Sequence, residues 1–154
     1  MTIENRYIFC EKPPVTSIKE LDELKRLNSK KIYFNYNFRY SKLGNILSNI
    51  KNFELGNLIY GTIIIGHGLS FKKEYALNWR SKKNLCKKGI FENVTIHWID
   101  LLNYYLKLNK VKSINMFNFS KVGNSYDNAF CKLSFDTNAE VDIFTSYSSP
   151  LIKK

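Results

Sequence analysis

The sequence of 154 residues lacks several features that would assign a protein to a class at once. No run of about 20 apolar residues occurs, so we expect no membrane-spanning helix, and the first residues lack the long apolar core of a signal peptide. Cysteine is scarce: Cys10, Cys86 and Cys131 are an odd number without a Cys-x-x-Cys pair. We therefore expect a cytoplasmic protein without a disulfide framework.

The motifs of several site types are also missing. Gly66-His67-Gly68 lacks the lysine and hydroxyl residue of a phosphate-binding P-loop, and Phe71 stands where a dinucleotide fingerprint has its third glycine. No His-Glu-x-x-His, paired cysteines or Gly-x-Ser-x-Gly elbow occurs. We expect no metal site, and we interpret residues 66–68 as a turn at a strand end.

Acidic residues are few, 13 against 24 Lys and Arg, which leaves a net charge of +11. Lysine doublets stand at positions 30–31, 72–73, 82–83, 87–88 and 153–154. No stripe of cations follows helical spacing and no nucleic-acid-binding motif is present, so we expect no nucleic-acid partner. Most of the charge is interpreted as solvated surface, and binding of a phosphorylated or nucleotide-bearing ligand is the alternative.

The first forty residues predict a β-α-β unit. Arg6–Cys10 has the composition of a strand and ends at two prolines. Ser17 with Glu20 forms a capping-box signal for a helix, and Lys31–Asn37 is predicted to be a second strand. Strands joined by such a crossover are expected to be parallel. A lone crossover pair is too small to form a buried sheet.

The remainder predicts an α+β layer. Helices are predicted at residues 41–51 and 90–108, and strands at 57–65, 111–119, 129–135 and 140–146, with a hairpin turn at Asp136–Asn138. Consecutive strands beside helices are typical of a mostly antiparallel open sheet with helices packed on one face. No internal repeat or linker is visible.

The stretch Gly89–Asp100 carries the most chemistry. On a helix, Asn93, His97 and Asp100 would project from one face, since residues three and four apart are neighbours. An unpaired buried polar group costs roughly 1–3 kcal/mol, so this trio needs partners or a task. Histidine can both take and give a proton near neutrality. The alternative is a core histidine that Asp100 or the backbone satisfies.

Two further stretches could contact a ligand. Glu11-Lys12-Pro13 follows a strand, and ligands of parallel sheets bind beyond the carboxyl ends of strands. A lysine there can hold a hydroxyl or carboxamide oxygen, and the alternative is a surface lysine before a turn. Asn78-Trp79-Arg80 offers an aromatic ring and a cation, with packing and a surface salt bridge as the alternative.

Taken in order, these segments resemble one family. The matching segments are Glu11–Pro13, Phe34–Tyr40, Leu55–Leu58, Asn78–Arg80, the glycine-led helix with His97 and Asp100, and Ser146–Pro150. Their order and spacing are similar to those of the Gfo/Idh/MocA family, the glucose-fructose oxidoreductase and inositol dehydrogenase group of NAD(P)-dependent oxidoreductases. The resemblance runs from about Tyr7 to Pro150.

In that family a Rossmann domain with a Gly-rich fingerprint precedes a C-terminal α+β domain. The resemblance implies that residues 1–40 are the residual end of the Rossmann domain and that residues 41–154 are the substrate-binding and oligomerisation domain. It implies a sugar, sugar nucleotide or polyol as substrate, NAD or NADP as cofactor, and a homo-oligomer formed through the sheet face. Because the fingerprint region is missing, we expect a truncated member that binds no cofactor alone.

The resemblance also assigns roles to individual residues. Lys12 matches the lysine that contacts nicotinamide and substrate, and His97 matches the general base for the substrate hydroxyl. Asn93, Arg80, Trp79 and Asp100 are the candidate substrate-binding residues, with Asp100 orienting His97. Glu11, Lys12, Pro13 and Arg39 are the candidate cofactor-binding residues.

Two departures from the family pattern bear on activity. The family often has an aspartate where this sequence has Asn93, which cannot take a proton but can hydrogen-bond a sugar hydroxyl. The Gly-Gly-Gly lead-in of the family is reduced to Lys87-Lys88-Gly89. These two departures point to a variant substrate, or to a non-catalytic module that assembles or binds a partner through its sheet.

Overall fold

A computed structural model describes residues 6–27, 29–49, 56–119 and 122–149. The chain divides into two units, Met1–Asn37 and Phe38–Lys154, and each is described by itself. This division falls three residues before the boundary that we expected at residue 40. Phe38 and Arg39 belong to the second unit because their side chains contact His97 and Asp100 of that unit.

The first unit is the β-α-β piece that the sequence predicts. Strands β1 (Ile8–Cys10) and β2 (Ile32–Phe34) pair in parallel, and helix α1 (Ile18–Arg26) lies between them in the chain. The capping box is confirmed: Glu20 N–H donates to Ser17 Oγ at 3.3 Å, and Ser17 N–H donates to the Glu20 carboxylate at 3.1 Å. No residue of α1 is buried within the chain.

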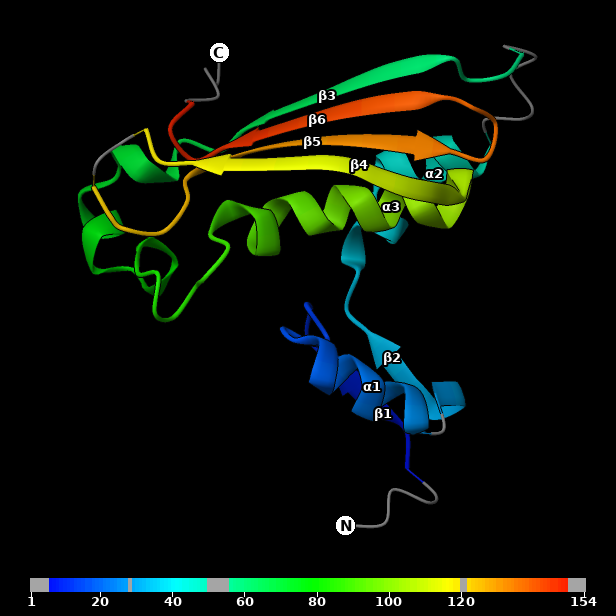
Figure 1. Ribbon diagram of the computed structural model, residues 1–154, viewed down its shortest axis with the longest axis horizontal. Helices are drawn as coiled ribbons and strands as arrows, with labels where there is room; N and C mark the ends of the chain where they lie inside the picture. The colour runs from blue at the N-terminus through cyan, green and yellow to red at the C-terminus, as the bar shows by residue number, and fades with distance from the viewer. Residues whose placement is uncertain (1–5, 28, 50–55, 120–121, 150–154) are drawn as a thin grey trace. The chain divides into compact units, whose positions relative to one another are not determined.

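The second unit is built on a four-stranded sheet with the order β3-β6-β5-β4 (Figure 1). The strands are β3 (Tyr60–Gly66), β4 (Leu108–Phe117), β5 (Asn128–Phe135) and β6 (Glu140–Ser146). The pairs β4–β5 and β5–β6 are antiparallel, while β3 and β6 are parallel. The predicted hairpin turn joins β5 to β6, and Asn138 adopts a φ of 61° within it.

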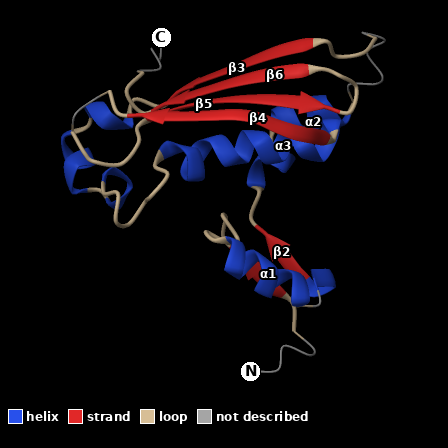
Figure 2. Cartoon of the chain, viewed as in Figure 1, coloured by secondary structure: helices blue, strands red, loops and turns tan. Residues whose placement is uncertain are grey.

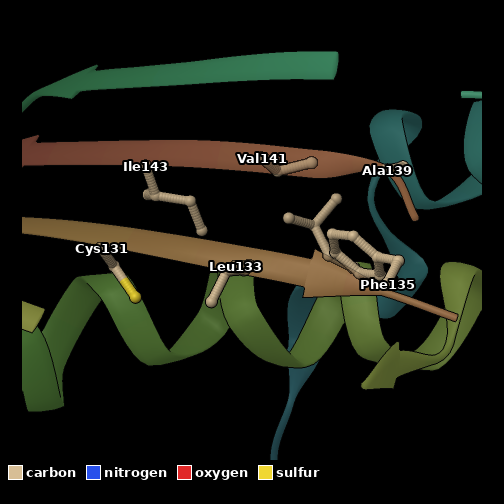
Figure 3. Packing of buried hydrophobic residues seen from close by; sticks show 7 residues of the cluster. Cys131, Leu133, Phe135, Ala139, Val141 and Ile143 are labelled. Carbon is tan, nitrogen blue, oxygen red and sulfur yellow. The ribbon is translucent and has the colours of Figure 1, made fainter. Parts of the chain in front are cut away.

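Helices α2 (Lys42–Ser48) and α3 (Ile96–Leu106) lie on the same side of this sheet (Figures 1 and 2). Alternate residues of β5 and β6 point toward α3 and form the core, where Leu133 and Ile143 are fully buried (Figure 3). Trp98 and Ile99 of α3 pack against this cluster. The predicted α+β layer, a largely antiparallel sheet with helices on one face, is therefore confirmed.

The predicted central helix begins with a wider turn. Phe91–Thr95 forms a π-helix that continues into α3, and Lys107 in the left-handed region ends the helix. Gly89 precedes it with a φ of 53°, and a Cβ there would lie 1.9 Å from the carbonyl oxygen of Tyr126. Only glycine allows the two backbones to lie this close. The close contact lets the next residue, Ile90, donate its N–H to the Tyr126 carbonyl oxygen at 2.9 Å.

Short 3-10 turns make up much of the remaining described chain. They are Ser29–Lys31, Asn37–Tyr40, Leu69–Phe71, Lys73–Leu77 and Trp79–Ser81. Within the described residues, no helix has the length and apolar character that crossing a bilayer requires.

Candidate functional site

His97 lies on the face of α3 that carries the predicted polar stripe. The ring of Phe38 stacks on its imidazole, with centroids 4.6 Å apart and an interplanar angle of 20°. The Phe38 ring also meets the edge of Trp98 at 5.2 Å. The imidazole is half-buried, and its Nδ1 is shielded from solvent. Phe38 therefore restricts how the imidazole can rotate.

Asp100 lies one turn after His97, and its carboxylate is held by Arg39. Arg39 Nε donates to Asp100 Oδ2 at 2.8 Å and Nη2 donates to Oδ1 at 2.5 Å. The Asp100 side chain is 11% exposed and that of Arg39 is 30% exposed. The hydrogen bond that the guanidinium donates to Asp100 raises the pKa of Arg39, and burial partly opposes that shift. The guanidinium also lies 4.4 Å from the centroid of the Tyr104 ring.

The structure pairs Asp100 and Arg39 with each other. Orientation of His97 by Asp100 and cofactor contact by Arg39 stay predictions. The geometry matches a planar guanidinium to a carboxylate in two parallel bonds, which is stronger than a single neutral hydrogen bond. Arg39 and Asp100 thus join the segment Asn37–Tyr40 to the helix that carries His97.

Helix α2 holds the backbone of Arg39 in place. Ser41 caps α2, and its hydroxyl accepts from Gly44 N–H at 3.1 Å. A Cβ on Gly44 would lie 2.2 Å from the carbonyl oxygen of Arg39, so only a glycine allows this contact. On its other side, the Tyr105 hydroxyl donates to the same carbonyl oxygen at 3.0 Å.

Asn93 makes local contacts at the start of the helix. Its Nδ2 donates to Cys86 Sγ and to the carbonyl oxygen of Gly89, both at 2.9 Å. Burial raises the pKa of the Cys86 thiol to about 12, and Glu92 adds to this effect. These bonds tie the π-turn to the preceding loop, and substrate binding by Asn93 stays a prediction.

Trp79 and Arg80 stack on each other. The guanidinium carbon of Arg80 lies 4.4 Å from the centroid of the Trp79 ring, which is 44% exposed as a residue. The side chain of Asn78 accepts from Arg80 N–H at 3.0 Å and caps the turn. Burial raises the pKa of Tyr147, and the nearby Arg80 opposes that shift. These contacts fit the packing part of the alternative, and no ion pair of Arg80 occurs among the described residues. Substrate binding by Trp79 and Arg80 stays a prediction.

Glu11 lies where the two parallel strands of the first unit end. Its Oε1 accepts from Asn35 Nδ2 at 2.8 Å, and Asn35 N–H donates to the Cys10 carbonyl at 2.8 Å. Lys12 follows, half-buried, and its peptide bond to Pro13 is cis. Lys12 and His97 belong to different units, so a shared cleft stays a prediction.

Sequence reasoning missed Phe38, which precedes the predicted Arg39, and Gly44, which follows Arg39 by five residues. A cavity of about 270 Å³ at the end of α3, lined by Leu58, Tyr105, Lys107 and Phe135 among others, contains none of the predicted site residues. Within the described residues, no cluster of three or more His, Cys, Asp or Glu is arranged to hold a metal ion.

The sequence matches a family model described as the GFO/IDH/MocA C-terminal domain over residues 48–152, more than half of the chain. A comparison with curated proteins found no match.

Solved structures share the fold. An oxidoreductase from Agrobacterium radiobacter, in complex with NAD+, L-tartaric acid and magnesium, is similar with a TM-score of 0.81 and 16% identity, covering 96% of this chain and 43% of that one. Levoglucosan dehydrogenase, in complex with NADH and levoglucosan, has a TM-score of 0.79 at 17% identity; the match covers 93% of this chain and 42% of that one. An inositol dehydrogenase homolog from Azotobacter vinelandii, complexed with NAD+, has a TM-score of 0.73 at 19% identity; the match covers 92% of this chain and 40% of that one. The chain spans less than half the length of each.

Proposed function

The chain belongs to the Gfo/Idh/MocA family, and from that membership we propose that it is the substrate-binding part of an NAD(P)-dependent oxidoreductase. The substrate would be a sugar, sugar nucleotide or polyol that loses hydride from a carbon bearing a hydroxyl group. The observation that carries this proposal is the position of His97, half-buried on the polar face of α3 within the matched domain.

Each protein group has a separate task in this proposal. His97 takes the proton of the substrate hydroxyl, because an imidazole is a base near neutrality. Phe38 limits the rotation of that imidazole, and the Arg39–Asp100 pair holds the turn on which it stands. Lys12 would stabilise the substrate oxygen with its charge. NAD or NADP, when bound, supplies the hydride acceptor.

We also propose that the chain requires a nucleotide-binding part to hold the cofactor. The sequence contains no Gly-x-Gly-x-x-Gly fingerprint, whose backbone N–H groups and helix N-terminus hold a pyrophosphate. Solved relatives complexed with NAD+ are more than twice as long. Isothermal titration of the chain with NAD+ and NADH should therefore show no stoichiometric binding, and tight binding to these 154 residues would contradict this part of the proposal.

Substrate binding can be tested on the chain alone by NMR. The sequence has only two histidines, so the ring signals of His67 and His97 can be assigned from His67→Gln and His97→Gln. A polyol or sugar that binds the site should shift the His97 signal and leave that of His67, an exposed residue, unchanged. If no polyol or sugar in a tested panel shifts the His97 signal, or if each shifts both histidine signals equally, a site at His97 would be contradicted.

A second candidate function is assembly through the open face of the sheet. Ile64, Phe144 and Phe130 are cross-strand neighbours and form an apolar row on the face away from α3. Ile64 is 72% exposed, and no described helix covers this face (Figure 2). Exposed apolar rows of this kind are typical of protein interfaces.

Charges beside this row are already paired. Lys112 and Lys132 both contact the carboxylate of Glu140, and the Tyr60 hydroxyl donates to Asp142 at 2.7 Å. A second copy could thus cover the face without burying an unpaired charge. Light scattering should show a dimer that Ile64→Lys disrupts and Leu77→Lys, at an exposed loop position, does not. A monomer at high concentration would exclude this function.

A further inference from the structure

Positive charge is concentrated in one stretch of the second unit. Three lysine doublets, 72–73, 82–83 and 87–88, lie between β3 and the π-helix, together with Arg80. Residues 69–88, here called the basic segment, hold seven Lys and Arg against the single acid Glu74. The segment therefore carries +6 of the net charge of +11.

Buried anchors hold the basic segment against the sheet unit. Ser70 donates its hydroxyl to the Tyr147 carbonyl at 2.9 Å, and Tyr75 is fully buried. The carbonyl oxygen of Ser81 accepts from two backbone N–H groups, those of Asn124 and Ser125, at 3.0 Å each. These contacts fix the backbone, so the lysines between the anchors project from a rigid frame.

The ion pairs of the described residues do not include the cations of the basic segment. By contrast, Lys112 and Lys132 on the sheet are paired with Glu140. Asp127, an acid of the following loop, is buried and accepts from Phe119 N–H at 2.8 Å, and Glu92 lies beside Cys86 of the segment. Clustered charges of one sign create a positive potential that attracts polyanions.

Aromatic rings lie among these cations. Arg80 covers Trp79 at 4.4 Å, and Lys83 Nζ lies 5.1 Å from the ring centroid of Tyr126. Lys83 N–H also donates to Asn124 Oδ1 at 2.7 Å, which joins the two stretches. Phe71 adds a third ring and is 62% exposed. Proteins that bind single strands combine a basic surface with aromatic side chains on which the bases stack.

We infer that the basic segment is a binding surface for single-stranded nucleic acid. Three separated doublets match an extended run of phosphates better than one small anion. The segment lines neither the cavity at the end of α3 nor the shallow hollow along α1 between Ile18 and Arg26. A second copy offers no matching acidic face, because Asp100 and Glu140 are already paired. This inference is independent of the proposed redox function and revises our expectation of no nucleic-acid partner.

Fluorescence anisotropy with a labelled oligothymidylate tests the inference on the full chain. An oligonucleotide of about 15 residues is long enough for one site. Binding should be measurable in 50 mM salt and should weaken steeply by about 200 mM, because bound lysines release counterions from the phosphates. No binding in low salt, or binding that salt does not change, would overturn the inference.

Matched variants separate the basic segment from the overall charge. Lys82→Gln with Lys83→Gln should weaken binding several-fold and reduce the salt slope by about 2, since each lysine accounts for about one phosphate contact. Lys42→Gln with Lys110→Gln removes the same charge from exposed positions elsewhere and should change binding far less. An equal loss of oligonucleotide affinity in the two double variants would overturn the inference.

Trp79→Ala tests the aromatic part of the surface. It should weaken oligothymidylate binding by about tenfold without changing the salt slope, because stacking releases no counterions. Circular dichroism checks that the variant is folded. Competition with anionic lipid vesicles and with poly-glutamate tests for other partners. The assignment to nucleic acid would be overturned if either competitor, added at the same total charge, displaced the oligonucleotide and Trp79→Ala bound the oligonucleotide as well as the native chain.

Discussion

Arg39 and Asp100 stand 61 positions apart in the chain and form a two-point ion pair beside His97. The bonds of 2.8 and 2.5 Å join a 3-10 turn to α3, and Tyr104 covers the guanidinium. Because Phe38 precedes Arg39 and stacks on His97, one short segment holds both the imidazole and the acid one turn away.

Removing the guanidinium should destabilise the protein measurably. Arg39→Met leaves the nearly buried carboxylate of Asp100 without its counter-charge. Breaking a buried pair costs roughly 3–5 kcal/mol, and since Arg39 is partly exposed we expect about 2 kcal/mol. Urea unfolding at pH 7 measures the loss.

Two controls accompany that measurement. Arg39→Met combined with Asp100→Asn should recover part of the stability, because no buried charge is then left unpaired. Lys25→Met breaks the exposed pair with Asp22 and should cost less than about 0.5 kcal/mol. A loss in Arg39→Met no larger than that of Lys25→Met would show that the pair contributes little.

Gly44→Ala should displace the segment that contains Arg39. The added methyl would lie 2.2 Å from the Arg39 carbonyl oxygen, so α2 or the segment must move, at a cost of roughly 1–3 kcal/mol. Gly61→Ala is the control, since its methyl would meet only the Val141 side chain, with Cγ2 at 3.4 Å and Cγ1 at 3.9 Å. Thermal unfolding compares the two, and equal midpoints would contradict the close contact at Gly44.

Only one of the three thiols should react quickly in the folded protein. Burial raises the pKa of Cys86 to about 12 and that of Cys131 to about 11, so neither forms much thiolate at pH 8. Cys10 is half-buried and should react first with Ellman's reagent. The fast reaction should vanish in Cys10→Ser, and urea should expose the other two. Fast reaction in Cys10→Ser would contradict this burial.

Ionisation of Glu140 should make the free energy of unfolding depend on pH in the acidic range. Its pKa is lowered, first by Lys112 and further by Lys132, so folding favours the ionised form. That contribution is complete above the ordinary glutamate pKa and is lost as the pH falls below about 4.5. Urea midpoints at pH 7 and pH 4 should therefore differ more in the native chain than in Glu140→Gln. Equal pH dependence in both would exclude this source.

Local chemistry accounts for most elements that the sequence predicted. The capping box at Ser17, the hairpin turn before β6 and the limits of β6 all follow from adjacent residues, which is why they could be predicted. The helix that contains His97 was predicted from its spacing, but its π-turn was not. That turn begins two residues after Gly89, whose close contact is with the backbone of Tyr126, 37 positions later.

Partners across the chain could not be derived from spacing. The shared face of His97 and Asp100 follows from helical geometry alone. Arg39 as the partner of Asp100, and Phe38 as the ring on His97, depend on how the turn Asn37–Tyr40 packs against α3. Arg39, 61 residues before Asp100, is one of 24 Lys and Arg side chains that could have paired with the acid.

The amino-acid order alone established the elements, the polar face of the central helix and the family, because each depends on neighbouring residues or on a sequence of short motifs. Folding established which distant groups meet: the guanidinium that holds Asp100, the ring that covers His97 and the tyrosine ring of residue 126 beside Lys83. Such contacts depend on packing between elements, and a linear pattern of residues does not encode packing directly.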